Sequence, residues 1–118
     1  MNFLWVALGG ACGALARYAL TLFFSGQLFP WVILGINIAG SFAIGLLVGL
    51  YAQSEWFNLY GRGLLVVGLL GGFTTFSAFS LETLTMLQDG RWPVALIYVV
   101  SSVLGCIGAV ALGWLVTR

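Results

Sequence analysis

The sequence predicts an all-α membrane protein with four transmembrane helices in one domain that covers residues 1–118. Hydrophobic residues make up 62% of the chain and charged residues only 6%, whereas a soluble domain carries about 25% charged residues. Mean hydropathy is +1.13. Because one span needs roughly 20 apolar residues, 118 residues divide into about four spans with short connections. The composition therefore excludes an ordinary soluble domain.

The first predicted span runs from Phe3 to Phe24, and Gly26 and Pro30 mark the end of this apolar run. Ala14-Leu15-Ala16 within it is similar to the cleavage site of a signal peptide. However, no positively charged segment precedes the run, and its hydrophobicity continues beyond Arg17. We therefore expect a membrane helix rather than a cleaved leader.

Three further apolar runs follow. The second is expected from Trp31 to Tyr51, and a polar stretch over residues 53–62 separates it from the third, which extends from Gly63 to Leu87. A turn-like Gln88-Asp89-Gly90-Arg91 cluster precedes the fourth run, which starts after Pro93 and reaches Val116. Aromatic residues lie near the expected helix ends, as in the aromatic belts of membrane proteins: Trp5, Trp31, Tyr51, Trp56, Tyr60, Trp92 and Trp114.

The third run contains an unusual segment rich in glycine and hydroxyl groups, residues 71–80. The paired glycines Gly71 and Gly72 weaken the helix, and the side chains of Thr74, Thr75, Ser77 and Ser80 can replace lost backbone partners. We therefore expect the third helix to be broken in its middle. Lipid cannot satisfy loosened backbone, so such a break is tolerated only where it faces protein or a watery cavity. The segment predicts a protein that handles a solute at this depth.

The arginines give no preferred orientation in the membrane. The chain has no lysine. With four spans, Arg62 and Arg118 lie on one side of the membrane. Arg91 lies on the other side, and Arg17 is nearer to that end of its own helix. This balance leaves the positive-inside rule without a decision, so an antiparallel homodimer is open to the chain. Small residues at one-turn spacing provide surfaces for close packing, either within a subunit or between subunits: Gly9 and Gly13, Gly45 and Gly49, Gly68 and Gly72, Ala109 and Gly113.

Several other classes of protein are disfavoured. The chain contains no histidine, and no nucleophile has a base nearby. Cys12 and Cys106 lie inside apolar runs without metal-ligand or redox spacing, so we interpret them as packing residues. Gly9, Gly10 and Gly13 follow no predicted strand and form no nucleotide-binding loop. We expect neither an enzyme nor a nucleic-acid-binding protein.

Polar residues at membrane depth form two further stripes. Asn37 and Ser41 lie four residues apart on the second span and therefore share a helical face. Tyr98 and Ser102 have the same spacing on the fourth span, and Cys106 continues that face. Interhelical hydrogen bonds, worth about 0.6 to 2 kcal/mol each, explain either stripe in isolation. The break in the third span favours a shared polar pathway.

The residues near the break favour an anion in this pathway. A broken helix presents carbonyls in one direction and amide hydrogens in the other, which suit a cation and an anion respectively. Phe73, Phe76 and Phe79 recur at a spacing typical of packing, but the edge of an aromatic ring is positive and can face a dehydrated anion.

Two ionisable residues inside the apolar runs are functional candidates by position alone, Arg17 and Glu82. Snorkelling or pairing explains Glu82 about as well as transport does, and Arg17 can equally anchor the first helix near an interface. No carboxylate accompanies Asn37 at the core, which argues against a proton-coupled cation site. We therefore favour an anion pathway lined by neutral donors.

At these residues the chain resembles the Fluc fluoride channels, also called the CrcB family, over nearly its whole length. The matching motifs are Gly9-Gly10, Gly13-Ala14 and Arg17-Tyr18 in the first span, Asn37 and Gly40-Ser41-Phe42 in the second, and Gly71-Gly72-Phe73-Thr74-Thr75-Phe76-Ser77 with Phe79 in the third. The third-span motif is highly specific. The resemblance implies a dual-topology antiparallel homodimer in the cell (inner) membrane, with two separate fluoride pores and a structural sodium ion at its centre.

The resemblance also implies roles for individual residues. Backbone carbonyls of Gly71 and Thr74 would hold the sodium ion. Residues lining the fluoride pore would be Asn37, Ser41, Thr75, Phe76, Ser77, Phe79, Tyr98 and Ser102. The chain departs from the family pattern at Cys106, where a further hydroxyl is expected, and at Ala78, which replaces a frequent threonine.

The implied function is passive export of fluoride, which enters cells as neutral hydrofluoric acid and dissociates in the more alkaline cytoplasm. The membrane potential, about 2.3 kcal/mol per charge per 100 mV, would expel the anion. Two other classes stay open at this point. A small multidrug-resistance type transporter needs an acidic residue in the first span, which Phe3 to Phe24 lacks. A structural membrane subunit would explain the small-residue faces but not the hydroxyl-rich break.

Overall fold

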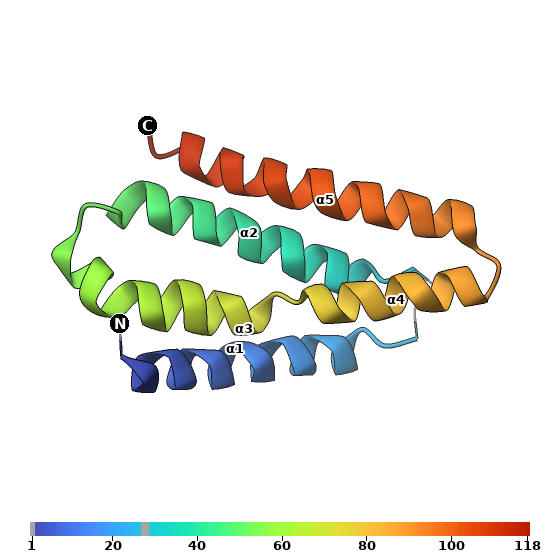
Figure 1. Cartoon of the computed structure of the whole chain (residues 1–118), viewed down its shortest axis with the longest axis horizontal. Helices are drawn as coiled ribbons and strands as arrows, with labels where there is room; N and C mark the ends of the chain where they lie inside the picture. Colours follow the sequence, from blue (N-terminus) through green and yellow to red (C-terminus); the bar gives the residue numbers. More distant parts are fainter. Residues whose placement is uncertain (1, 27–28) are drawn as a thin grey trace.

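The computed structural model describes residues 2–26 and 29–118, and within these ranges every regular element is a helix. Four helical segments are long and apolar enough to span a membrane, as the sequence predicts (Figure 1). The helices are α1 Phe3–Phe23, α2 Trp31–Tyr51, η1 Phe57–Leu70, α3 Gly71–Phe73, α4 Phe76–Gln88 and α5 Trp92–Leu115. The third span, Phe57–Gln88, consists of η1, α3 and α4. The predicted all-α membrane fold is confirmed at the level of the protomer.

The third span begins earlier than the predicted Gly63, because polar residues of the expected loop support its first turn. Ser54 Oγ accepts a hydrogen bond from the Phe57 amide (3.3 Å), and Asn58 Nδ2 donates to the Ala52 carbonyl (3.0 Å). The Phe57 side chain is fully buried, and the Arg62 guanidinium lies 5.3 Å from the centre of its ring. A polar stretch that reads as a loop is thus partly a helix start. The π-helix η1 carries the chain from there to α3.

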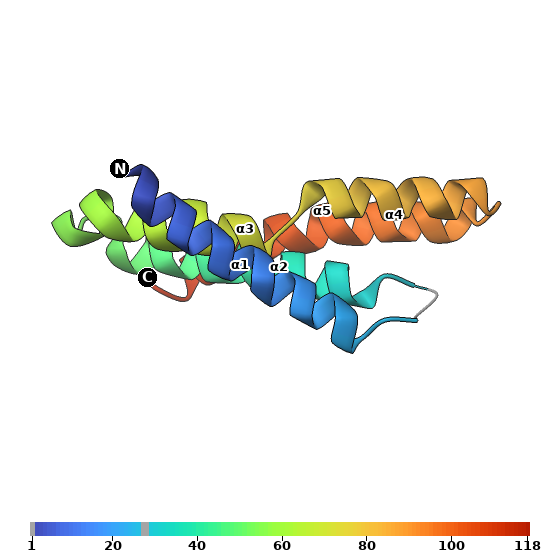
Figure 2. The ribbon, with the colours of Figure 1, turned by 90° about the horizontal axis from the view of Figure 1, so that it is seen from below.

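The third span is interrupted at two extended residues, as the paired glycines predict. Thr74 has φ −81° and ψ 156°, and Thr75 has φ −153° and ψ 121°. The helix resumes as α4 at Phe76, and Figure 2 shows α4 displaced sideways from α3. Thr75 is the N-cap of α4, since its side chain accepts a hydrogen bond from the Ala78 amide.

Glycines bring the helices into close contact in two pairs, α1 with η1 and α2 with α5. A Cβ on Gly13 would collide with the Leu69 carbonyl, and one on Gly113 would collide with the Phe42 carbonyl. The small residues that the sequence offers for packing therefore serve contacts within one protomer. Those in close or buried contact are Gly9, Gly13, Gly45, Gly49, Gly68, Gly72, Ala109 and Gly113.

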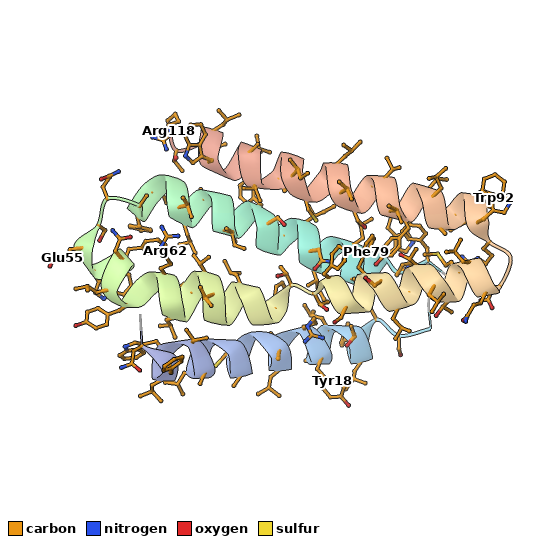
Figure 3. All side chains as sticks on the ribbon, in the orientation of Figure 1. Tyr18, Glu55, Arg62, Phe79, Trp92 and Arg118 are labelled. Carbon is orange, nitrogen blue, oxygen red and sulfur yellow. The ribbon has the colours of Figure 1, made fainter. Side chains whose placement is uncertain are left out.

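The surface of the protomer matches a bilayer. The molecule measures 50 × 30 × 20 Å, and a bilayer with its headgroups is about 40–45 Å thick. Exposed tryptophans stand at the helix ends, and Figure 3 labels Trp92 at one end of the molecule and Arg118 at the other. The Arg118 guanidinium lies 4.0 Å from the centre of the Trp114 ring, a cation–π contact that suits an interface.

Candidate functional site

A groove beside the break gathers most of the polar residues that the sequence singles out. It has a volume of about 300 Å³ and lies between α2, the α3–α4 junction and α5. Its lining consists of Asn37, Ser41, Thr74, Thr75, Phe76, Phe79, Ser102, Val103, Cys106 and Ile107. Asn37 and Ser41 of α2 therefore lie with Ser102 and Cys106 of α5 beside the break. One-turn spacing places the two residues of each pair on the same face of their helix.

Asn37 holds the extended residues of the break. Its Oδ1 accepts a hydrogen bond from the Thr75 amide (2.8 Å), and its Nδ2 donates to the Thr75 carbonyl (3.1 Å). Paired residues of two neighbouring β-strands form the same two hydrogen bonds between their backbone amides and carbonyls. Here the Asn37 side-chain amide takes the place of the second backbone. An asparagine Nδ2 carries two N–H groups, and this exchange uses one of them.

The break separates four backbone carbonyls from their usual helical donors, those of Gly71, Gly72, Phe73 and Thr74. In an unbroken α-helix the Thr75 amide would donate to the Gly71 carbonyl, and the Ala78 amide to the Thr74 carbonyl. Here the Thr75 amide donates to Asn37, and the Ala78 amide donates to Thr75 Oγ1 (3.1 Å). The carbonyl oxygens of Gly71 and Thr74 thus lack their helical donors, and Gly71 is exposed on the protomer surface.

Hydroxyl groups near the break are mostly engaged with the backbone. Thr74 Oγ1 donates to the Leu70 carbonyl (2.9 Å), and Ser80 Oγ donates to the Phe76 carbonyl (2.9 Å). Thr75 Oγ1 and Ser77 Oγ lie 3.1 Å apart. Ser77 is exposed and lies outside the groove lining, although its hydroxyl contacts a residue of the groove.

The two phenylalanines of the groove differ in burial. Phe76 is 76% exposed and Phe79 is 7% exposed, and their ring centres are 5.3 Å apart. Phe79 also packs against the fully buried ring of Tyr98, at 5.1 Å between centres. Figure 3 shows Phe79 pointing between α4 and its neighbours. One ring is therefore fixed by packing, and the other stands open.

Two buried hydroxyls on α5 have no hydrogen-bond partner within the described residues, Tyr98 Oη and Ser102 Oγ. Ser102 lines the groove, whereas Tyr98 lies behind Phe79. A buried hydroxyl without a partner is costly, so such groups normally meet water or another polar species. The two residues are one helical turn apart on α5, and Ser102 is the one that adds a hydroxyl to the groove lining.

The two intramembrane charges lie outside the groove. Arg17 is partly buried on α1, and its Nε donates to the Gly72 carbonyl at 3.2 Å. Glu82 lines a separate hollow of about 130 Å³ near the α1–α2 connection. The geometry thus links Arg17 to the break itself and leaves Glu82 apart from the groove lining.

Sequence reasoning missed two apolar residues of the groove, Val103 and Ile107. They follow Ser102 and Cys106 directly in the chain, so they border the polar stripe of α5. The stripe's spacing would have found this edge, because residues beside a helical face also contact what the face contacts.

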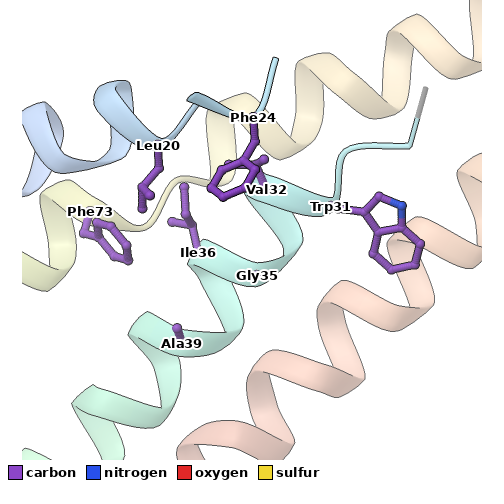
Figure 4. A pocket seen from close by; sticks show the side chains of 8 residues that line it. All are labelled: Leu20, Phe24, Trp31, Val32, Gly35, Ile36, Ala39 and Phe73. Atoms are coloured by element: carbon purple, nitrogen blue, oxygen red, sulfur yellow. The ribbon is translucent and has the colours of Figure 1, made fainter. Parts of the chain in front are cut away.

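A separate apolar hollow lies between α1 and α2 (Figure 4). It has a volume of about 390 Å³, and its lining consists of Leu20, Phe24, Trp31, Val32, Gly35, Ile36, Ala39 and Phe73. An ion requires several polar ligands, and this lining is almost wholly apolar. The groove beside the break is therefore the candidate site.

Comparison with known proteins identifies the family to which the chain belongs. A family model described as "CrcB-like protein, Camphor Resistance (CrcB)" matches residues 4–114. The chain belongs to the CrcB family. This membership confirms the resemblance drawn from the motifs of the first three spans.

Several curated CrcB relatives align over nearly their whole length. A protein from Magnetococcus marinus named "Fluoride-specific ion channel FluC" is 49% identical over 121 residues, which cover 100% of this chain and 98% of the relative. Proteins of the same name from Opitutus terrae and Paramagnetospirillum magneticum are 45% and 46% identical, over 94% and 96% of this chain and 88% and 92% of the relatives. With its four apolar helices, this CrcB protein is a multi-pass membrane protein, of the inner membrane in a bacterium.

Proposed function

We propose that this protein is a fluoride-selective channel that lets fluoride leave the cytoplasm passively. The observation that carries the proposal is the groove at the break, where neutral hydrogen-bond donors and aromatic rings line one pathway. The names of the relatives support fluoride as the ion. No pump is needed, because the membrane potential supplies about 2.3 kcal/mol per charge per 100 mV. A channel is not an enzyme, which agrees with the sequence-based expectation.

The proposed selectivity rests on replacing the water shell of a small hard anion. The Asn37 amide and the hydroxyls of Ser41 and Ser102 donate hydrogen bonds, and the edges of Phe76 and Phe79 offer positive potential. Thr75, Ser77 and Tyr98 extend this track of neutral donors. Because no formal charge lines the groove, an anion would bind weakly enough to move on.

We propose that two protomers insert in opposite directions and form an antiparallel dimer with two pores. A single protomer leaves the groove open, and the ring of Phe76 is 76% exposed. A second copy would enclose it, and two-fold symmetry would then produce two equivalent pathways. The balanced arginines support insertion in both directions.

We also propose that a structural sodium ion lies on the dimer axis between the breaks. The released carbonyls of Gly71 and Thr74 from two subunits would offer about four oxygen ligands without formal charge, which suit a monovalent hard cation. Within the described residues no cluster of His, Cys, Asp or Glu could hold a metal ion. The ion would satisfy carbonyls that are otherwise costly in a dry environment.

Fluoride release from liposomes tests the proposed channel. Purified protein is reconstituted with internal fluoride, and a potassium gradient with valinomycin sets the potential. We expect fast fluoride release and little chloride release, with empty liposomes as the control. Uptake of a cationic drug driven by a proton gradient, without fluoride release, would instead identify a small multidrug-resistance type transporter. Folded dimer that releases nothing would leave only a structural role.

A further inference from the structure

Arg17 is a charged residue of the first membrane span whose side chain reaches the break in the third. Its Nε donates to the Gly72 carbonyl at 3.2 Å, across a separation of 55 residues in the sequence. The side chain is partly buried. A charged group at this depth is costly unless it has a specific partner, and the partner here is a backbone oxygen.

This hydrogen bond replaces one that the break removes. In an unbroken α-helix the Phe76 amide would donate to the Gly72 carbonyl. Phe76 is instead the first residue of α4, where amides have no partner in their own helix. Arg17 therefore supplies a hydrogen-bond donor that the Gly72 carbonyl would otherwise lack.

The break removes the helical donors of four carbonyls, those of Gly71, Gly72, Phe73 and Thr74. Arg17 contacts the Gly72 carbonyl and Asn37 contacts the Thr75 carbonyl. The helical donors of Gly71 and Thr74 are diverted to side chains, and Phe73 loses its donor because the Ser77 amide lies in the first turn of α4. Arg17 thus occupies one of the four carbonyls that the break releases.

The glycine face of α1 allows Arg17 to reach this position. Gly13 lies one turn before Arg17 on the same face, and a Cβ there would collide with the Leu69 carbonyl. On the opposite side of the contact, a Cβ on Gly72 would lie 2.6 Å from the Gly10 carbonyl. The two backbones touch directly, so the arginine side chain can fold along the contact to the end of α3.

We propose that Arg17 is a positioning residue that substitutes for the Phe76 amide on the Gly72 carbonyl and thereby holds the end of α3 in the geometry that presents the neighbouring break carbonyls to a cation. The guanidinium also complements the negative end of the η1–α3 segment. The link to a cation rests on the proposed function, whereas the hydrogen bond and its structural role do not.

Carbonyl NMR tests the hydrogen bond without reference to transport. Gly72-Phe73 is the one Gly-Phe pair in the sequence, so glycine labelled with ¹³C at its carbonyl and phenylalanine labelled with ¹⁵N give a single correlated signal for Gly72. In the full-length protein, Arg17→Met should move this carbon upfield, because a hydrogen bond from a cation deshields a carbonyl. Arg62→Met, the same change away from the break, should leave it in place. An unchanged signal in Arg17→Met would overturn the proposal.

Sodium dependence of fluoride efflux tests the consequence for the ion. We expect Arg17→Met to raise the sodium concentration for half-maximal efflux at least about tenfold, as for loss of one hydrogen bond to a charged group, and Arg17→Lys to raise it less. If Arg17 only attracts fluoride, Arg17→Lys will conduct normally and Arg17→Met will lose flux with unchanged sodium dependence, which would overturn the positioning role.

Misfolding of Arg17→Met and a lack of fluoride release by the unmodified protein can each be distinguished from failure of the proposal. If Arg17→Met fails to elute as folded protein in size-exclusion chromatography, Arg17→Lys carries the NMR test, with a smaller upfield movement expected and no movement contradicting the proposal. If the unmodified protein releases no fluoride, the proposed function fails, but the Gly72 signal still decides whether Arg17 caps this carbonyl.

Discussion

At the scale of single residues, the break depends on side chains that take over backbone hydrogen bonds. Asn37 exchanges two bonds with Thr75, and Thr75 Oγ1 accepts the Ala78 amide. In the membrane these partners cannot be replaced by bulk water. A change of one such atom should therefore cost both stability and the geometry of the groove.

Asn37→Asp tests this dependence with almost no change in size. The aspartate can still accept the Thr75 amide, but it cannot donate to the Thr75 carbonyl, and its second oxygen then faces that carbonyl. We expect a loss of about 1–3 kcal/mol in stability and a sharp fall in fluoride efflux, measured by thermal unfolding in detergent and by liposome flux. Ser41→Ala, one turn further on α2, is the control and should melt close to the unmodified protein. Equal melting of Asn37→Asp and the unmodified protein would contradict this account.

The two phenylalanines of the groove should separate packing from conduction. Replacement by isoleucine keeps much of the volume and removes the ring edge, so fluoride efflux should fall in both Phe76→Ile and Phe79→Ile. Thermal stability should fall only in Phe79→Ile, by about 1 kcal/mol, because Phe79 is buried against Tyr98 whereas Phe76 is largely exposed. Normal efflux in both variants would mean that the rings serve packing alone.

At the scale of helices, glycine contacts set the distances on which the site depends. The α2–α5 contact positions Asn37 and Ser102 on either side of the groove. At the other end of the α2–α5 contact, Gly113 packs directly against the Phe42 carbonyl. Backbone-to-backbone contact leaves no flexible side chain that could yield, so a methyl group there must move a helix.

Gly113→Ala and Gly108→Ala form a matched pair on α5. The first places a Cβ against the Phe42 carbonyl, whereas a Cβ on Gly108 meets no atom within 4 Å. We expect Gly113→Ala to lose about 1–3 kcal/mol of stability, and Gly108→Ala to gain up to about 1 kcal/mol from helix propensity. Thermal unfolding of the purified proteins measures both. Equal stability of the Gly113→Ala and Gly108→Ala variants would show that the Gly113–Phe42 contact does not limit how closely α2 and α5 pack.

At the scale of the whole molecule, the protomer presents a long apolar surface and an open groove. The arginines do not bias its orientation, and the groove at the break requires a cover to become a pore. Insertion in both directions would provide that cover from a second copy. The antiparallel dimer stays a prediction that topology measurements can decide.

Cysteine labelling in intact cells tests dual topology. In a background with Cys12→Ala and Cys106→Ser, single cysteines are placed by Arg62→Cys and Asp89→Cys, near opposite ends of the third span. Both should react partly with an impermeant thiol reagent from outside, and the remainder after permeabilisation. A protein with one orientation would label from outside at one site and only after permeabilisation at the other, which would exclude the antiparallel dimer.

Much of the architecture follows from the sequence by itself. Composition and apolar runs predict the four spans, and the paired glycines with their hydroxyl neighbours predict a break within residues 71–80, which the structure has at Thr74 and Thr75. One-turn spacing places Asn37 with Ser41, and Ser102 with Cys106, on common faces that line the groove. These features are local, because span length, helix weakening and helical periodicity depend on residues within a few turns of one another.

Only the tertiary structure decides which partners these residues find. The Asn37–Thr75 exchange and the Arg17–Gly72 bond join residues 38 and 55 positions apart, and the early start of the third span depends on contacts of Ser54 and Asn58. Glycine spacing likewise does not say whether a face meets its own chain or a second copy, and the structure assigns these faces to contacts within the protomer. The physical reason is that such contacts depend on how closely two backbones approach, and that distance is a property of packed helices rather than of either sequence segment.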